Sequence, residues 1–289
     1  MKTELKKDEV VPIVFDIMFK TILMDNKEYL ADILSNILDM DKDYILDNLV
    51  FKNTEQSILG ISEKRKITDL IVDIDKLTIN LEMNASYSKA LVRKNNAYLS
   101  RIILSGIKRS EAYDDLDITI IQINFDKKWK FDDELITIFE MRNKNTYKKR
   151  SSYIDSNDPV IYHVNLSKAY KMYYNNDRKL NTFIKELALM IADNKKDLDN
   201  ISKGNRVMED VAEKITSLSM DDYIKGYYIK EEQDEWMKKV DINDAMKKGL
   251  EKGEIIGISK TAKKMKEENI PLDTIIKITG LSKEELEKL

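Results

Sequence analysis

The segment ITDLIVDIDKLTINLEMNAS, residues 67 to 86, restricts the possible folds of this chain more than any other stretch. Its second half alternates apolar and polar residues strictly, which is the period of a β-strand with two unlike faces. The apolar face would hold Leu77, Ile79, Leu81 and Met83, and the polar face Thr78, Asn80, Glu82 and Asn84. Because such a strand packs one face on a core, the pattern predicts that the polar face is open to solvent. A turn near residues 73–76 would join the two halves into an antiparallel hairpin.

Helical and extended patterns on both sides of this hairpin predict the fold class. Residues 13–24 and the stretch that follows Asn26, a suitable N-cap, repeat apolar residues at helical spacing. Residues 87–109 also favour a helix. Runs typical of strands occur at 117–125, 135–141 and 160–166. The order of elements predicts an α+β core of two helices, the hairpin, a helix and three more strands.

After about residue 167 the strand patterns stop, and charge-rich helices are expected to the C-terminus. Glycines recur at every fourth position, at Gly249, Gly253 and Gly257. On a helix they would form one smooth stripe that permits close helix packing, although each glycine costs about 1 kcal/mol of helix stability. We predict two domains, a sheet-containing domain over residues 1–195 and a helical C-terminal region over residues 196–289.

The final segment, residues 271–289, favours two short helices. Gly280 is suited to end the first helix, and Ser282 with Glu285 spells a capping box for the second. In outline this resembles a helix-turn-helix. A small docking or oligomerisation tail is the simpler interpretation, so the tail is a candidate surface for homo-oligomer formation.

Composition excludes several classes of protein. With 42% apolar and 35% charged residues among 289, the chain fits a soluble globular protein. No apolar run approaches the roughly 20 residues that cross a bilayer, and the first residues lack an apolar signal core, so we expect a cytoplasmic protein without membrane contact. The absence of cysteine removes disulfides and thiolate metal sites. No GxxxxGK[ST] or GxGxxG loop occurs, so no nucleotide cofactor is expected. His163, the single histidine, lies in a predicted strand and is interpreted as structural.

Charge is nearly balanced over the whole chain, at −3, but it is unbalanced locally. Two stretches contain basic residues and no acidic ones. From Ser88 to Ser110 these are Lys89, Arg93, Lys94, Arg101, Lys108 and Arg109, and from Met141 to Ile154 they are Arg142, Lys144, Lys148, Lys149 and Arg150. Such one-signed stretches favour an anionic partner, with a plain solvated surface as the alternative.

Two carboxylates, Asp69 and Glu82, lie on the two halves of the predicted hairpin. With a turn near residues 74–77, their Cα atoms would come within one or two strand spacings. Carboxylate oxygens are ligands that Mg²⁺ prefers, and Mg²⁺ activates water and neutralises charge on a phosphate. Ordinary surface charge on a hairpin is the alternative.

Motifs at four places, in order along the chain, extend this pattern. They are Asp16-Ile17-Met18-Phe19-Lys20, then Thr68-Asp69 before Leu70-Ile71-Val72, then Asn80-Leu81-Glu82-Met83-Asn84, and finally Arg93 with Tyr98 in RKNNAYLSR. In their order and spacing these motifs resemble the PD-(D/E)XK nuclease superfamily. They resemble more closely one family within it, the PD-(D/E)XK nuclease family transposases, or Rpn-type recombination-promoting nucleases. ITGLSKEEL near the C-terminus is also typical of that family's tail. The resemblance implies a restriction-endonuclease-like core, a mixed central sheet flanked by helices.

The resemblance also implies an activity, that of a DNA endonuclease dependent on Mg²⁺ or Mn²⁺ and acting on double-stranded DNA. Asp69 and Glu82 would be the metal ligands, and the residue at position 84 would orient the attacking water. Asp16 would be an outer acid of the site, with a simple helix N-terminal charge as the alternative. The DNA backbone would be met by basic side chains of the following helix, namely Lys89, Arg93, Lys94 and Arg101.

One departure from the family pattern concerns Asn84, because the family has glutamine and the wider superfamily has lysine at this position. Asparagine is one methylene shorter, about 1.5 Å less in reach, and carries no charge. Lys89 or Lys66 are candidates for a substitute charge. If the site is a weakened nuclease, Asn84→Gln is expected to raise cleavage. The alternatives are a catalytically degenerate relative that binds DNA or protein, and a structural module whose acids are surface charge.

Overall fold

The computed structural model describes residues 4–52, 70–85, 89–105, 119–153, 158–176 and 180–288. Within it the chain forms two compact units, Glu4–Tyr228 and Ile229–Leu289. The boundary between the units falls inside one long helix, α9 (Asp222–Glu267). The functional division at residues 195 and 196 stays a prediction.

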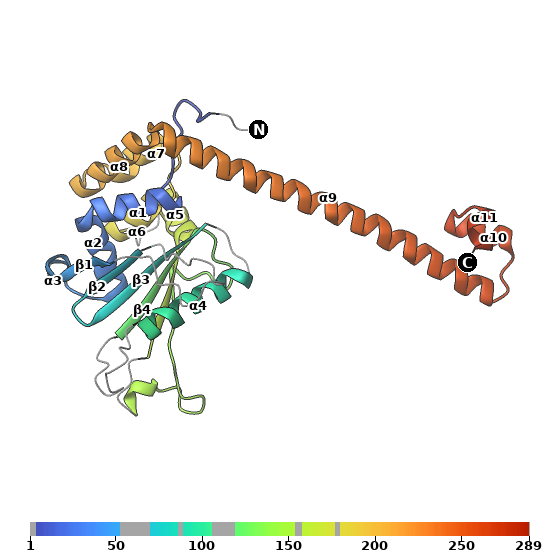
Figure 1. Ribbon diagram of the computed structural model, residues 1–289, viewed down its shortest axis with the longest axis horizontal. Helices are drawn as coiled ribbons and strands as arrows, with labels where there is room; N and C mark the ends of the chain where they lie inside the picture. The colour runs from blue at the N-terminus through green and yellow to red at the C-terminus, as the bar shows by residue number, and fades with distance from the viewer. Residues whose placement is uncertain are drawn as a thin grey trace. The chain divides into compact units, whose positions relative to one another are not determined.

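A mixed six-stranded sheet forms the centre of the first unit (Figure 1). Its strands are β1 (Leu49–Lys52), β2 (Leu70–Ile74), β3 (Leu77–Asn84), β4 (Thr119–Asp126), β5 (Ile136–Phe139) and β6 (Val160–Asn165), in the spatial order β1-β2-β3-β4-β6-β5. The β2–β3 hairpin is antiparallel and pairs Leu70 with Leu81, which confirms the predicted hairpin. From β3 to β4 and from β4 to β6 the pairing is parallel, so the carboxyl ends of these three strands lie at one edge.

Helices flank the sheet, as expected from the sequence. They are α1 (Asp16–Asp25), α2 (Lys27–Leu38), α3 (Lys42–Asn48), α4 (Lys89–Ser105), α5 (Leu166–Tyr174), α6 (Thr182–Leu189), α7 (Lys195–Ser202) and α8 (Arg206–Ser219), and the 3-10 helix η2 (Arg150–Ser152) also belongs to the described residues. Figure 1 shows α4 on one side of the sheet and α1 and α2 on the other. The predicted fold class, an α+β core with a helical C-terminal region, is therefore confirmed.

The large core lies between the sheet and the helices on the α1 and α2 side. The strands contribute alternate residues, such as Leu81 on β3 and Phe125 on β4, and these are fully buried. Phe125 meets Phe19 of α1 with ring centroids 5.8 Å apart. The apolar face predicted for residues 77–83 is thus the face that packs on this core.

The opposite face of the sheet is also covered, which the alternation alone did not predict. A smaller apolar cluster joins Leu99 and Ile102 of α4 to Ile71 and Ile120 of the sheet. Beside it lies the polar face of β3, where the side chains of Asn80, Glu82 and Asn84 are buried, with 0%, 0% and 3% exposed. The expectation of an open polar face is therefore wrong, because β3 is a central strand with helix α4 on its polar side.

The second unit ends in the two short helices expected from the sequence, α10 (Leu272–Thr279) and α11 (Lys283–Glu287). Gly280 follows α10 in the left-handed conformation, with φ 71°, which a glycine adopts without steric cost. Ser282 and Glu285 form the complete capping box of α11. These helices pack on the end of α9 through Ala262, Ile275 and Leu286.

Candidate metal and nucleic-acid site

Polar side chains from three parallel strands form a grid on the α4 side of the sheet. The register places Glu82, Asn124 and His163 in one row, and Asn84, Asp126 and Asn165 in the next row toward the carboxyl ends. Carboxyl ends of strands are common ligand-binding edges in open sheets. Sequence reasoning missed the β4 members, because residues 117–125 read as one apolar run. The signal was nevertheless present, since Gln122, Asn124 and Asp126 alternate with apolar residues.

Glu82 is the more deeply buried of the two carboxylates of this grid, with 0% exposed against 5% for Asp126. Asn80 donates from Nδ2 to Glu82 Oε1 at 3.3 Å, and Lys94 of α4 places Nζ 3.4 Å from Oε2. Lys94 also lies over the Tyr98 ring, with Nζ 5.0 Å from the ring centroid. A cationic partner stabilises the charged form of a buried carboxylate. Lys94, predicted to face DNA, therefore directs its charge toward Glu82.

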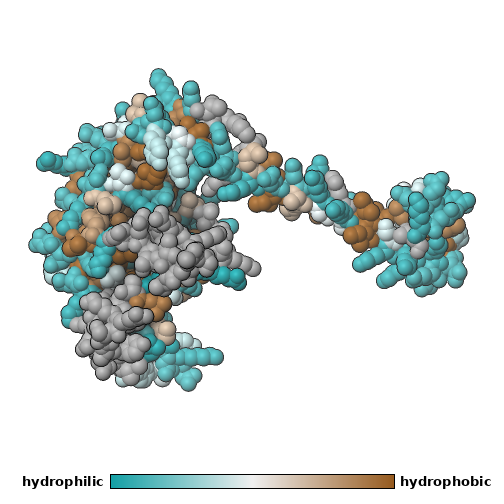
Figure 2. Space-filling model, viewed as in Figure 1, coloured by the Kyte–Doolittle hydropathy of each residue, from teal (hydrophilic) through white to brown (hydrophobic). Residues whose placement is uncertain are grey.

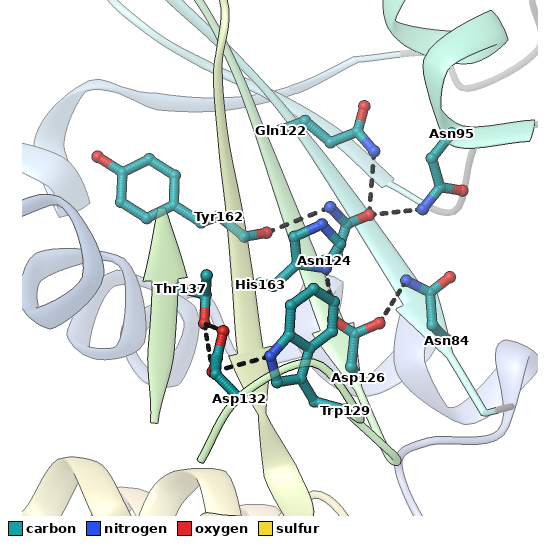
Figure 3. Close-up of polar contacts among 10 residues, drawn as sticks. All are labelled: Asn84, Asn95, Gln122, Asn124, Asp126, Trp129, Asp132, Thr137, Tyr162 and His163. Atoms are coloured by element: carbon teal, nitrogen blue, oxygen red, sulfur yellow. Dashed lines mark hydrogen bonds and ion pairs between the residues drawn. The ribbon is translucent and has the colours of Figure 1, made fainter. Parts of the chain in front are cut away.

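Asn84 is held by a chain of contacts that crosses the sheet (Figure 3). It donates from Nδ2 to Asp126 Oδ1 at 2.9 Å, and Asp126 Oδ2 lies 2.7 Å from Nδ1 of His163. Trp129 stacks on the His163 ring, with centroids 4.3 Å apart, and donates from Nε1 to Asp132 at 3.0 Å. A charged carboxylate only accepts hydrogen bonds, so the amide nitrogen of Asn84 faces Asp126 and its oxygen faces away. His163 lies in a strand, β6, as predicted, and its interpretation as a structural residue stays a prediction.

Asn124 is the centre of a second group of amides (Figure 3). Its Oδ1 accepts from Asn95 Nδ2 at 2.7 Å and from Gln122 Nε2 at 3.0 Å, while its Nδ2 donates to the Tyr162 carbonyl at 3.2 Å. Asn95 belongs to α4, so this group ties the helix to the sheet.

Four amide oxygens in the grid or next to it are buried and lack a hydrogen-bond partner among the described residues. They belong to Asn80, Asn84, Asn95 and Gln122. An unpaired buried acceptor costs about 1–3 kcal/mol, so a native protein usually satisfies it. Carboxylate and amide oxygens are the ligands that suit Mg²⁺, and Glu82 lies two residues from Asn84 on the same face. The residues present therefore fit a divalent cation, although the described ranges contain no group of three His, Asp or Glu side chains able to hold one.

The other residues predicted for the site have different positions. Asp69 lies outside the described residues, as does the side chain of Lys89. Arg93 is exposed on α4, and Arg101 is partly exposed. Asp16 lies in the first turn of α1, and Lys20 places Nζ 3.3 Å from its Oδ1, so these two side chains form an ion pair.

The second basic stretch, residues 141–154, pairs with acids at its flanks. Glu140 accepts from Arg142 and lies 2.7 Å from Lys149 Nζ, and Asp158 pairs with Arg150. These two acids stand just outside the one-signed segment, so much of its charge is neutralised within the chain.

A mixed sheet with flanking helices and a buried glutamate on a central strand is the arrangement of a nuclease-like fold. The model of the PD-(D/E)XK nuclease family transposases matches residues 13–245, and the chain belongs to this family. This confirms the family expected from the four motifs. Comparisons with curated proteins and with solved structures gave no match.

Proposed function

We propose that the protein is a divalent-metal-dependent DNA endonuclease of the transposase-associated type, active in DNA recombination and hydrolysing phosphodiester bonds of double-stranded DNA. The observation that carries this proposal is Glu82, a fully buried carboxylate beside amide oxygens without partners. A carboxylate in this position is costly for stability alone, because both the charge and the neighbouring acceptors lose contact with water. Membership of the nuclease family supports the same interpretation.

Glu82, Asp69 and the Asn84 side-chain oxygen are the groups that would hold Mg²⁺ or Mn²⁺. Glu82 and Asn84 lie on one face of β3, and the family pattern adds Asp69, which lies outside the described residues. When bound, the ion would lower the pKa of a water and offset charge on the phosphate. Asp126 and His163 keep the Asn84 amide in one orientation, and Asp16 is retained as an outer acid.

Helix α4 would approach the DNA backbone through its basic residues. Arg93 is exposed, and Lys89 and Arg101 belong to the same helix. Lys94 would act in the metal site and not on the DNA backbone. Its ammonium lies next to Glu82 and would supply the positive charge that Asn84 lacks. From the sequence alone, Lys89 or Lys66 is the candidate for that charge.

The test is nicking of plasmid DNA with Mg²⁺ or Mn²⁺. Glu82→Gln and Asp69→Asn should each abolish nicking, since each removes a charged oxygen ligand while keeping side-chain shape. Glu186→Gln is the matched control, because Glu186 is equally buried but lies on α6 in the opposite core. Nicking that survives Glu82→Gln, or that needs no divalent metal, would contradict the proposal.

A second candidate is a catalytically degenerate relative that binds DNA or protein, and the Lys94–Glu82 ion pair favours it because the pair already compensates the carboxylate. This candidate predicts salt-sensitive DNA binding without cleavage. Arg93→Gln should then weaken binding, whereas Glu82→Gln should leave it unchanged.

We further propose that two copies of the chain associate through the second unit. On α9, five residues recur at the 4-3-4-3 spacing of a helix–helix seam, namely Ile242, Met246, Gly249, Gly253 and Ile256. We call them the α9 seam. Its apolar members are more than half exposed, and a Cβ added at either glycine would meet no atom within 4 Å. Figure 2 shows apolar residues (brown) interleaved with polar ones along this helix.

The proposed location is the cytoplasm. In the part of the chain that the structure describes, no helix has the length and apolarity to span a bilayer.

A further inference from the structure

Three aromatic rings lie together where the sheet ends at its edge strand β5. Trp129 meets Phe131 with ring centroids 4.7 Å apart and Phe139 at 6.5 Å, in both cases edge to face. Phe139 also meets His163, with centroids 5.7 Å apart. We call Trp129, Phe131 and Phe139 the aromatic edge.

The aromatic edge is exposed although it is apolar. Phe131 and Phe139 are 58% and 51% exposed. One face of the Trp129 ring stacks on His163, and its Nε1 donates to Asp132, so the ring is held in place by two contacts. Grouped exposed aromatics of this kind mark an interaction surface, and a fixed ring loses little conformational entropy when a ligand stacks on its neighbours.

The aromatic edge belongs to the same face of the sheet as the candidate metal site. Glu82, Asn124, His163 and Thr137 are successive Cα partners across β3, β4, β6 and β5. Strands lie about 4.8 Å apart, so the His163 Cα is about 10 Å from the Glu82 Cα. Trp129 covers His163, which places the aromatic edge beside the proposed cleavage site, within reach of neighbouring nucleotides.

The charge of this region suits a nucleic acid. Residues 127–131 read KKWKF, with lysines between the aromatics, and Lys128 and Lys130 are exposed. Neither lysine forms an ion pair within the described ranges. The acids that follow are engaged, because Asp132 accepts from Trp129 and Thr137 and Asp133 pairs with Lys168 at 3.0 Å. Glu134, also exposed, is the remaining acid of this turn.

We propose that the aromatic edge stacks unpaired bases of single-stranded DNA, held by phosphate contacts to Lys128 and Lys130. The proposal rests on the proposed DNA function and names the structural feature of the substrate. Stacking of a base on an aromatic side chain contributes about 1–3 kcal/mol, and only an unpaired base has a free face to offer. DNA with a single-stranded segment beside the cleaved bond is then preferred over intact duplex.

Trp129 itself reports the contact. The chain has two tryptophans, so the full-length Trp236→Phe protein emits from Trp129 alone. Oligothymidylate should quench this fluorescence and bind at least about tenfold more tightly than duplex DNA of equal length, which corresponds to one stacked base. The salt dependence of binding should lose about 0.7 in slope for each lysine removed by Lys128→Gln or Lys130→Gln.

Leucine substitutions separate stacking from simple apolar contact. Phe131→Leu and Phe139→Leu keep an apolar side chain but lose the π-face, so each should weaken oligothymidylate binding about tenfold or more. Tyr223→Leu is the control, because Tyr223 is an exposed aromatic of α9 away from the sheet, and it should bind like the parent. Unchanged binding in both phenylalanine variants, absence of quenching, or duplex binding as tight as single-strand binding would overturn the proposal.

These outcomes are independent of the endonuclease test. Quenching without any plasmid nicking would support base stacking on the aromatic edge and contradict the proposed endonuclease activity. Metal-dependent nicking without quenching supports the endonuclease and removes the aromatic edge.

Discussion

Asn84 is shorter than the glutamine of the family pattern, yet its length matches the contact that it makes. Its amide nitrogen reaches Asp126 at 2.9 Å, and Asp126 is held in turn by His163. A glutamine would carry the amide about one methylene past this partner, in a site that is almost fully buried. The sequence alone predicts that Asn84→Gln raises cleavage. Because of the contact with Asp126, we now expect that Asn84→Gln does not raise cleavage.

Exchanging the two side chains tests this contact. Asn84→Asp alone sets two carboxylates against each other and should lower the free energy of unfolding, whereas Asn84→Asp with Asp126→Asn restores one donor and one acceptor. We expect the double variant to recover at least about 1 kcal/mol relative to the sum of the single changes. Urea unfolding of all four proteins gives this coupling energy.

The ion pair of exposed Asp16 with half-buried Lys20 on α1 serves as the control cycle, with an expected coupling of about 0.3–0.5 kcal/mol. A coupling between positions 84 and 126 as small as this one would mean that the buried contact does not hold the amide.

At the scale of the elements, helices α2 and α6 pack against each other with a buried acid, Glu186, on α6. Glu186 of α6 is 1% exposed, and neither of its carboxylate oxygens has a hydrogen-bond partner among the described residues. Burial is the main cause that raises the pKa of Glu186 to about 8, and the nearby carboxylate of Asp32 on α2 is the second. Glu186 is therefore a neutral acid at moderate pH, and its backbone carbonyl accepts from Tyr29 of α2 at 2.7 Å.

This acid makes the stability of the first unit fall as pH rises. Between the ordinary carboxyl pKa of 4.5 and the folded value of about 8, the folded protein binds more protons than the unfolded chain. The free energy of unfolding should decline across this window, by an amount on the order of a few kcal/mol. Glu186→Gln should remove the decline, which denaturant unfolding measured across the window will show. An equal decline in the variant would assign the effect to other groups.

At the scale of the whole molecule, the chain divides into a sheet-containing unit and a helical unit joined through one continuous helix. The first unit has a large core on one side of its sheet. The second has a small core at its end, and the apolar members of the α9 seam are exposed in the part of the chain that the structure describes. This unequal burial is the reason to expect that the second unit completes its packing with another copy.

Self-association should depend on one side of α9. Met246→Lys places a charge in the α9 seam and should shift the protein toward the monomer, as measured by sedimentation over a range of concentrations. Ile255→Lys is the matched control, because Ile255 is 62% exposed against 64% for Met246 and lies on the opposite side of the helix. A monomeric parent, or equal effects of both variants, would rule out association through the seam.

Local patterns predicted most of the elements because their information lies in neighbouring residues. The hairpin follows from the alternation after Leu77, and the capping box of α11 from Ser282 and Glu285. The short strand β1 was not expected, because its four residues pair with β2 and carry little pattern of their own. The polar side of β4 was present in the alternation of Gln122 and Asn124 but was obscured by the run of β-branched residues that precedes them, residues 118–121.

By itself the sequence determined the family, the fold class and the candidate role of Glu82, because these depend on residue types at short spacings. Only the tertiary structure decided what surrounds them. It brought Lys94 to Glu82, Asp126 to Asn84 and the aromatic edge to the same face. These contacts join residues from separate strands and a helix, and their partners are set by the parallel order of β3, β4 and β6, which no local pattern encodes.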